Sequence, residues 1–245
     1  MRADLEQTIR QGRIAPVYIL YGEDSYSRQQ NAEELAEAIS AARGGADLNV
    51  YDASESSVDD IVTGILTVPM FASSRVVVVR RFEEIPTAQQ GRIISLIAPG
   101  KARTDLQMPE GTSVIFISGS TSLPRKAVSA AGDNVVAAEF RPAYASDARS
   151  FVYSRARELG IEIRPDGVEL LIEFAGADYG ALTQEIEKLI TYLGPRRDSG
   201  RMCIDVDHIR AAVGRSPTRT VFEFCDAAIA GDCQGAMSAL DDLLR

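Results

Sequence analysis

Residue types that mark metal sites and disulfide-bonded proteins are scarce in this sequence of 245 residues. It has one histidine, three cysteines and no tryptophan, and the cysteines form no Cys-x-x-Cys pair. A structural zinc site needs about four ligands at close spacing, so we expect no metal centre. Three scattered cysteines also suit no disulfide framework, and a reducing cytoplasm is the simplest compartment for them.

Long apolar runs and an excess of basic residues are absent as well. No stretch approaches the roughly 20 apolar residues that cross a bilayer, and the polar start, MRADLEQTIRQGR, lacks the apolar core of a signal peptide. The formal net charge is −9. Coating nucleic acid by bulk electrostatics needs a clustered basic surface. We therefore expect no membrane partner, and nucleic acid only through a local basic patch or within a larger complex.

Strand and helix patterns alternate through the first 140 residues. The β-rich runs lie at 16–22, 48–53, 74–81, 112–119 and 134–140. Helical patterns separate them, at 25–42, 56–68, 88–98 and 123–132. This alternation is typical of a parallel sheet with helices on both faces. We therefore predict an α/β domain over residues 1–141.

Strand patterns stop after Pro142, and helical patterns continue to the end of the sequence. Three of them end on a glycine, the common C-terminal cap: Gly160, Gly176 and Gly194. A small helical domain is therefore predicted over residues 142–214. A new helical pattern follows and stops at Arg245 without a cap, so we expect residues 215–245 to begin a further helical domain.

The turn after the first predicted strand stands where parallel α/β sheets usually bind phosphate. It reads GEDSYSRQQ, in which only Gly22 fits the pattern G-x-x-x-x-G-K-[ST]. Ser27, Arg28 and Gln29 stand at the positions of the second glycine, the lysine and the hydroxyl residue. Without the second glycine, the turn lacks the nest of backbone N–H groups that binds phosphate, and Gln29 cannot offer a hydroxyl to magnesium.

The charges around this turn also disfavour a nucleotide. Glu23 and Asp24 place negative charge where phosphates would sit. The third strand ends in Arg80 and Arg81, where a nucleotide hydrolase carries acidic residues for magnesium and water. We predict a degenerate phosphate loop that serves only as scaffold and binds no cofactor. The alternative is a divergent P-loop ATPase or nucleotide kinase, which would bind ATP with magnesium at this turn.

Met70 and Phe71 are two large apolar residues in a predicted turn, directly after Pro69. Loops usually run over the surface, so these side chains either fold back to cap the sheet edge or contact a partner. The periodicity alone favours the core slightly, and the residues leave both interpretations open.

Four stretches resemble the delta subunit of the bacterial DNA polymerase III clamp loader. They are the opening strand and turn at 16–30, the segment 48–81, the helices at 147–194 and the last helical pattern from 221 onward. The third includes G-x-D-x-x-x-L-x-x-E-x-x-K-L from Gly176 to Leu189. The resemblance covers nearly the whole chain in order. It departs from the family at Phe151, where a tryptophan-like aromatic is expected, and most of the family's collar domain is missing.

This resemblance implies an AAA+-like fold of the P-loop NTPase class without ATPase activity. Residues 142–214 would be the lid domain and residues 215–245 the start of the collar, through which such subunits assemble. The chain would be a non-catalytic subunit of the DNA polymerase III holoenzyme, a nucleotidyltransferase complex, in the cytoplasm and with the replisome at the nucleoid. Its partners would be the sliding clamp (beta subunit), the gamma/tau and delta prime subunits, and primer–template DNA.

The family binds the ring-shaped clamp through an apolar wedge and helps to open it during DNA replication. The resemblance assigns the wedge to Met70 and Phe71, with support from Ile65, Leu66 and Pro69.

Arg125 and Lys126 begin a predicted helix after the fourth strand. In an assembled loader they would be candidates for facing DNA, and a solvated helix turn explains them equally well. A stand-alone DNA-binding protein is a third hypothesis, which the acidic net charge disfavours.

Overall fold

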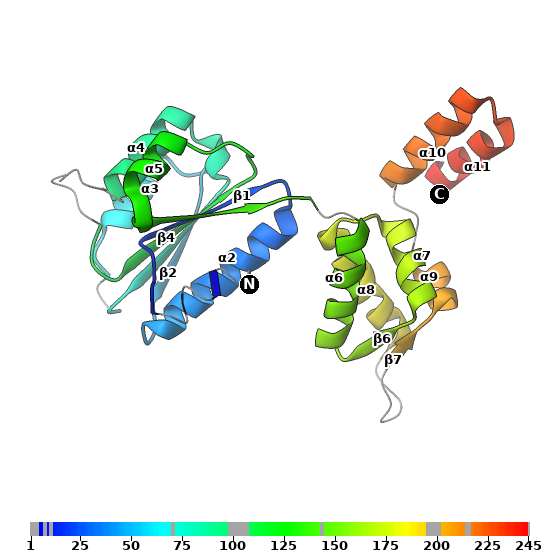
Figure 1. Cartoon of the computed structure of the whole chain (residues 1–245), viewed down its shortest axis with the longest axis horizontal. Coiled ribbons are helices and arrows are strands. Elements are labelled where there is room, and N and C mark those ends of the chain that lie inside the picture. The colour runs from blue at the N-terminus through cyan, green and yellow to red at the C-terminus, as the bar shows by residue number, and fades with distance from the viewer. Residues whose placement is uncertain are drawn as a thin grey trace. The chain divides into compact units, whose positions relative to one another are not determined.

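The computed structural model describes residues 5, 6, 9, 12–69, 72–97, 108–142, 145–194, 202–213 and 217–244. The chain forms two compact units, Met1–Arg141 and Pro142–Arg245 (Figure 1). Among the residues described, two hydrophobic clusters lie in the first unit and one lies in the second.

A five-stranded parallel sheet with the strand order β2-β3-β4-β1-β5 forms the centre of the first unit. Its strands are β1 (Val17–Gly22), β2 (Asp47–Asp52), β3 (Arg75–Arg80), β4 (Thr112–Ser118) and β5 (Val135–Phe140). Every residue of β4 is buried. Near-continuous apolar strands of this kind are typical of a parallel sheet that is covered on both faces.

Helices cover both faces of this sheet (Figure 1). They are α2 (Ser25–Ala42), α3 (Val58–Leu66), α4 (Thr87–Ile97) and α5 (Arg125–Ala131). Helix α2 packs on one face of the sheet and the other three helices pack on the opposite face. Alternate residues of each strand point to opposite faces, so every covered strand contributes side chains to both layers. The predicted parallel sheet with helices on both faces is therefore confirmed.

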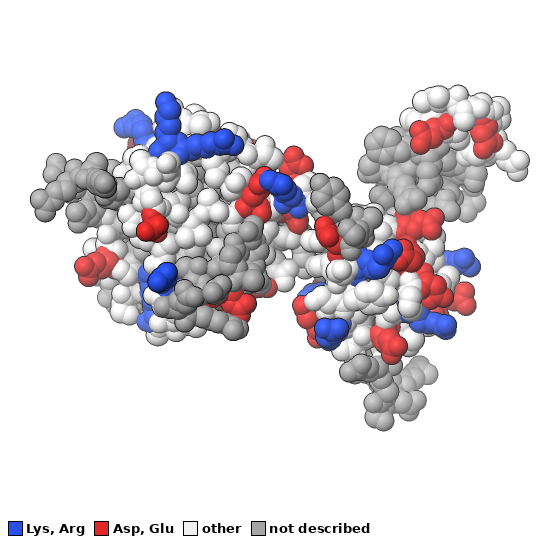
Figure 2. All heavy atoms as spheres, in the orientation of Figure 1, with Lys and Arg blue, Asp and Glu red and all other residues white. Residues whose placement is uncertain are grey.

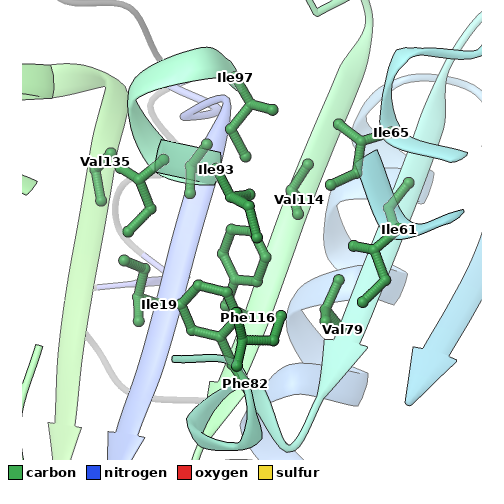
Figure 3. Packing of buried hydrophobic residues seen from close by; sticks show 14 of the residues in the cluster. Ile19, Ile61, Ile65, Val79, Phe82, Ile93, Ile97, Val114, Phe116 and Val135 are labelled. Carbon is green, nitrogen blue, oxygen red and sulfur yellow. The ribbon is translucent and has the colours of Figure 1, made fainter. Parts of the chain in front are cut away.

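The core beneath α3 and α4 is built from isoleucines that point at the sheet. Figure 3 shows Ile61, Ile65, Ile93 and Ile97 around the strand residues, with all four buried. The rings of Phe82 and Phe116 lie here with their centroids 4.1 Å apart. Phe82 begins the short 3-10 helix η1 (Phe82–Glu84), so this contact anchors the segment that follows β3.

Four helices surround the core of the second unit, centred on Leu182, Ile186 and Leu189. They are α6 (Ala145–Glu158), α7 (Pro165–Ala175), α8 (Tyr179–Leu193) and α9 (Val206–Ala212). The rings of Phe151 and Tyr179 stack with their centroids 4.3 Å apart.

Two short strands in this unit correct the prediction that strands stop after Pro142. Strand β6 (Ile161–Ile163) pairs in parallel with β7 (Met202–Ile204). Each has only three residues, which is too short to show the two-residue period of a strand. The two strands that pair also lie far apart in the sequence, so no local pattern indicates their pairing.

The last two helices, α10 (Pro217–Ala230) and α11 (Cys233–Leu244), pack against each other as a hairpin. The helical C-terminal part that the sequence predicts is thereby confirmed. Its division into a lid at 142–214 and a collar from 215 stays a prediction. Within the described ranges, no helix combines the length and apolar character needed to cross a membrane.

Candidate functional site

The turn after β1 meets the N-terminus of α2, where a phosphate loop would bind an anion through free backbone N–H groups. Here the carboxylate of Asp24 takes that place. Asp24 is the N-cap of α2, and its Oδ1 atom accepts a hydrogen bond of 2.9 Å from the N–H of Ser27. This carboxylate is largely buried. A phosphate at this helix terminus would have to displace this carboxylate and would be repelled by its charge.

At Gly22 the backbone of this turn lies directly against the end of β5. Its φ angle is +122°, and a Cβ atom on it would lie 2.1 Å from the carbonyl oxygen of Phe140. The same carbonyl accepts a hydrogen bond of 3.3 Å from the N–H of Asp24. The close approach of two backbones therefore accounts for the glycine without any bound phosphate.

Arg28, at the position of the phosphate-binding lysine, is buried with 9% of its surface exposed. Burial lowers the pKa of Arg28, while the charges of Glu83 and Asp24 act in the opposite direction. A Cβ atom built on Gly119 would lie 2.7 Å from Oε1 of Glu83 and 3.7 Å from Nη2 of Arg28. The cation at the lysine position therefore lies among carboxylates of its own chain.

Gln29, at the position of the magnesium-binding hydroxyl, bonds along the helix instead. Its Nε2 atom donates a hydrogen bond of 2.6 Å to Oε1 of Glu33. The structure thus gathers Gly22, Ser27 and Arg28 around the N-terminus of α2 and leaves Gln29 on the side of the helix. Among the described residues, no group of three or more His, Cys, Asp or Glu is placed to hold a metal ion.

The end of β3 carries a surface ion pair where a hydrolase would carry magnesium ligands. The Nε of Arg81 donates to Oδ1 of Asp52 at 2.7 Å, and its Nη2 lies 2.7 Å from Oδ2. The hydrogen bond from Arg81 is the largest cause that lowers the pKa of Asp52 to about 2. Arg80, the last residue of β3, is exposed. Both arginines thus lie at the surface beside the strand end.

The apolar loop between α3 and β3 is described on both sides of its tip. Met70 and Phe71 lie outside the described residues. Ile65 is fully buried beneath α3, whereas Leu66 and Pro69 are half-buried. Ile65 thus belongs to the core that holds α3, and the other two lie at the border between core and solvent.

Arg75, the first residue of β3, reaches back to the other end of this loop. Its Nη1 atom donates hydrogen bonds to the carbonyl oxygens of Gly64 at 3.1 Å and Thr67 at 2.8 Å. Its Nε and Nη2 atoms donate to Oδ2 of Asp47 at 3.2 and 2.8 Å. No sequence pattern distinguishes Arg75 from an ordinary strand residue, because its partners come from α3 and β2.

Arg125 and Lys126 are exposed at the start of α5. They line an open cleft of about 1030 Å³ together with Arg92 of α4. Gly91 faces the start of α5, since a Cβ on it would lie 3.9 Å from the Cβ atoms of Pro124 and Ala127. Figure 2 shows basic side chains gathered over this part of the first unit. Sequence reasoning missed Arg92, because only the packing of α4 on α5 brings it here.

Comparisons of sequence point to one family. Residues 18–102 match the family model described as DNA polymerase III, delta subunit. The DNA polymerase III subunit delta of Bacillus subtilis is 21% identical over 99% of this chain and 69% of its own length. The probable DNA polymerase III subunit delta of Aquifex aeolicus is 25% identical over 93% of this chain and 63% of its own length.

Solved structures show the fold. The DNA clamp loader delta protein of Bacillus subtilis has a TM-score of 0.61 and 20% identity, over 100% of this chain and 71% of its own. The Holliday junction branch migration motor RuvB of Thermotoga maritima has a TM-score of 0.53 and 13% identity, over 84% of this chain and 64% of its own. The α/β part and the helical C-terminal part are thus similar to clamp-loader and RuvB AAA+ folds. The resemblance to DNA polymerase III delta subunits is therefore confirmed, with a delta-subunit domain matched over residues 18–102.

Proposed function

We propose that this chain is a non-catalytic subunit of a DNA polymerase III clamp loader, which binds the sliding clamp and helps to open it for loading on primed DNA. The observation that carries the proposal is the delta-subunit match over residues 18–102. That range contains both the degenerate phosphate loop and the apolar loop with Met70 and Phe71.

A role without ATP hydrolysis is supported by the geometry at the N-terminus of α2. The carboxylate of Asp24 occupies the anion position through the N–H of Ser27. Arg28 is buried near Glu83, which disfavours its contact with a nucleotide. In this proposal the neighbouring loader subunits supply ATP hydrolysis, and this chain supplies contact with the clamp.

Met70 and Phe71 would be the anchors of that contact. Burying a side chain of this size fully is worth roughly 1.5–3 kcal/mol, and two adjacent anchors in a pocket can form an interface hot spot. Pro69 restricts the backbone beside them, which lowers the entropy lost on docking. A subunit that binds the open ring more tightly than the closed ring shifts the clamp towards opening by that difference in affinity.

Further partners follow from the same assignment. The helices from residue 217 onward would begin the collar that joins this chain to the gamma/tau and delta prime subunits. The cleft of Arg92, Arg125 and Lys126 has the charge that suits the phosphates of primer–template DNA in the assembled loader. Such a complex would work in the cytoplasm, within the replisome.

The proposal is tested by binding of the chain to an immobilised sliding clamp from the same organism, with and without magnesium and ATP. We expect binding with the same affinity in both conditions, because the anion position on α2 is already taken. Absence of binding to the clamp would contradict the proposed function. Binding that requires ATP would favour the alternative of a working P-loop ATPase.

A further inference from the structure

The loop between α3 and β3 is closed at its base by one side chain. The Nη1 atom of Arg75 donates a hydrogen bond of 2.8 Å to the carbonyl oxygen of Thr67, eight residues earlier. The two ends of the loop are therefore joined through a single guanidinium. Joining the ends restricts the conformations that the intervening residues can adopt.

The same guanidinium completes the C-terminus of α3. The last carbonyls of a helix have no partner within the helix. Helix α3 ends at Leu66, and its C-cap Thr67 is extended, with ψ at 127°. Arg75 donates to the carbonyl of Gly64 at 3.1 Å, and the hydroxyl of Thr67 donates to the carbonyl of Thr63 at 2.6 Å. A cation here also lies at the negative end of the helix dipole. Arg75 thus fixes the point at which the loop leaves α3.

Asp47, at the start of the edge strand β2, orients this guanidinium. It accepts hydrogen bonds from Nε and Nη2, which leaves Nη1 directed at the helix end. The Arg75 side chain is 11% exposed and that of Asp47 is 41% exposed. Hydrogen bonds at a partly buried position are stronger than hydrogen bonds on the open surface.

A second tie lies at the β3 end of the loop. The hydroxyl of Ser74 donates to the carbonyl of Gly45 at 2.8 Å, and the N–H of Asp47 donates to the carbonyl of Ser74 at 3.0 Å. The β3 end of the loop is therefore bonded directly to the segment that leads from α2 into β2, and the α3 end is linked to Asp47 through Arg75.

An open cavity lies beside the described part of this loop. The cavity has a volume of about 730 Å³, and its lining includes Thr67, Val68, Ala72 and Ser73 of the loop together with the glycines at 44–45 and their neighbours. Val68 is 66% exposed. Beside this cavity, the hydrogen bonds at the two ends of the loop constrain the position of its described residues directly.

We infer that Arg75 is a positioning residue for clamp binding, which presets the loop through its bonds to Thr67 and Gly64. The inference rests on the proposed function of the loop. A preset loop loses less conformational entropy when it docks. Loss of the bonds from Arg75 to Thr67 and Gly64 therefore weakens clamp binding, although Arg75 itself need not touch the clamp.

The test uses the full chain, an immobilised sliding clamp and the substitution Arg75→Lys. Lysine keeps the charge, but its single ammonium cannot span Asp47, Gly64 and Thr67 as the planar guanidinium does. We expect an affinity lower by about tenfold or more. The matched control is Arg80→Lys, the same change at the exposed far end of β3, which should alter the affinity less than about twofold.

Two further measurements separate positioning from general destabilisation. Without clamp, hydrogen exchange of the peptide covering 61–75 should be faster in Arg75→Lys than in Arg80→Lys. In a Met70→Ala, Phe71→Ala background, Arg75→Lys should cause little additional loss of affinity, because the anchors that it positions are gone. Asp47→Asn serves as a second variant, with a smaller loss in the same direction, should Arg75→Lys fold poorly.

Unchanged affinity and unchanged exchange in Arg75→Lys and Asp47→Asn would overturn the inference and leave the proposed function standing. An equal loss in the background without anchors would also overturn it, since the effect would not pass through the loop. If the unaltered chain does not bind the clamp, the proposed function fails, and the docking role of Arg75 fails with it.

Discussion

The Oδ1 atom of Asp24 accepts a hydrogen bond of 2.9 Å from the backbone N–H of Ser27 at the start of α2. In a parallel α/β sheet this helix terminus is the natural anion site. The chain therefore satisfies the site with its own carboxylate. The same bond places a carboxylate of the chain itself at the position where a phosphate turn would hold its anion.

Replacing this cap should cost stability. We expect Asp24→Ala to lower the free energy of unfolding by about 0.5–2 kcal/mol, because the N–H of Ser27 loses its partner. Ser57→Ala is the matched control, since Ser57 caps α3 and accepts from the N–H of Asp60 at 3.1 Å. Urea unfolding of both variants checks the prediction. A loss in Ser57→Ala but none in Asp24→Ala would contradict the role of Asp24.

Nucleotide should leave the stability of the chain unchanged. A ligand that binds only the folded state at about 100 times its Kd would add about 2.7 kcal/mol. We expect no shift of the unfolding midpoint when magnesium and ATP are added at millimolar concentration. The measurement is thermal or urea unfolding with and without the nucleotide, with AMP as the control for nonspecific effects. A clear rise with ATP alone would support the ATPase alternative.

Two helical glycines should respond to alanine in opposite directions. In α3, a Cβ on Gly64 would lie 2.1 Å from the hydroxyl oxygen of Tyr51, so Gly64→Ala forces that ring aside and should cost about 1–3 kcal/mol. In α4, a Cβ on Gly91 would meet only atoms at 3.9 Å, so Gly91→Ala should gain up to about 1 kcal/mol from helix propensity. Urea unfolding measures both. Similar effects of the two changes would contradict the packing of β2 against α3.

The ion pair of Asp52 and Arg81 predicts a pH dependence at acid pH. The pKa of Asp52 is lowered to about 2 in the folded chain, below its ordinary value of about 3.9. Its contribution to stability is therefore present above about pH 4 and is lost as the pH falls towards 2. The stability difference between the unaltered chain and Asp52→Asn should shrink over that range, and a constant difference would contradict the pairing.

The architecture was largely predictable because its signals are local. Five β-rich runs separated by helical patterns indicated the parallel sheet, and glycines at 176 and 194 marked helix ends that the structure confirms, with φ angles of +84° and +72°. The strands β6 and β7 were missed, since three residues give no period and the pairing partner is distant.

The site was less predictable because its contacts join distant segments. The motif comparison identified the turn at Gly22–Gln29, but it did not indicate that Glu83 lies beside Arg28 or that Arg92 joins Arg125. Arg75 looked like an ordinary strand residue. Its bonds to Asp47, Gly64 and Thr67 exist only once α3, β2 and β3 have packed.

Binding of the Met70→Ala, Phe71→Ala double variant to the immobilised sliding clamp tests the central claim most directly. The matched control is Leu48→Ala with Val50→Ala, two exposed apolar residues of β2 at 56% and 51% exposure. We predict that the unaltered chain and the control bind alike, and that the double variant loses at least about 3 kcal/mol of binding free energy. Equal binding by all three chains would contradict the wedge and place the contact with the clamp elsewhere.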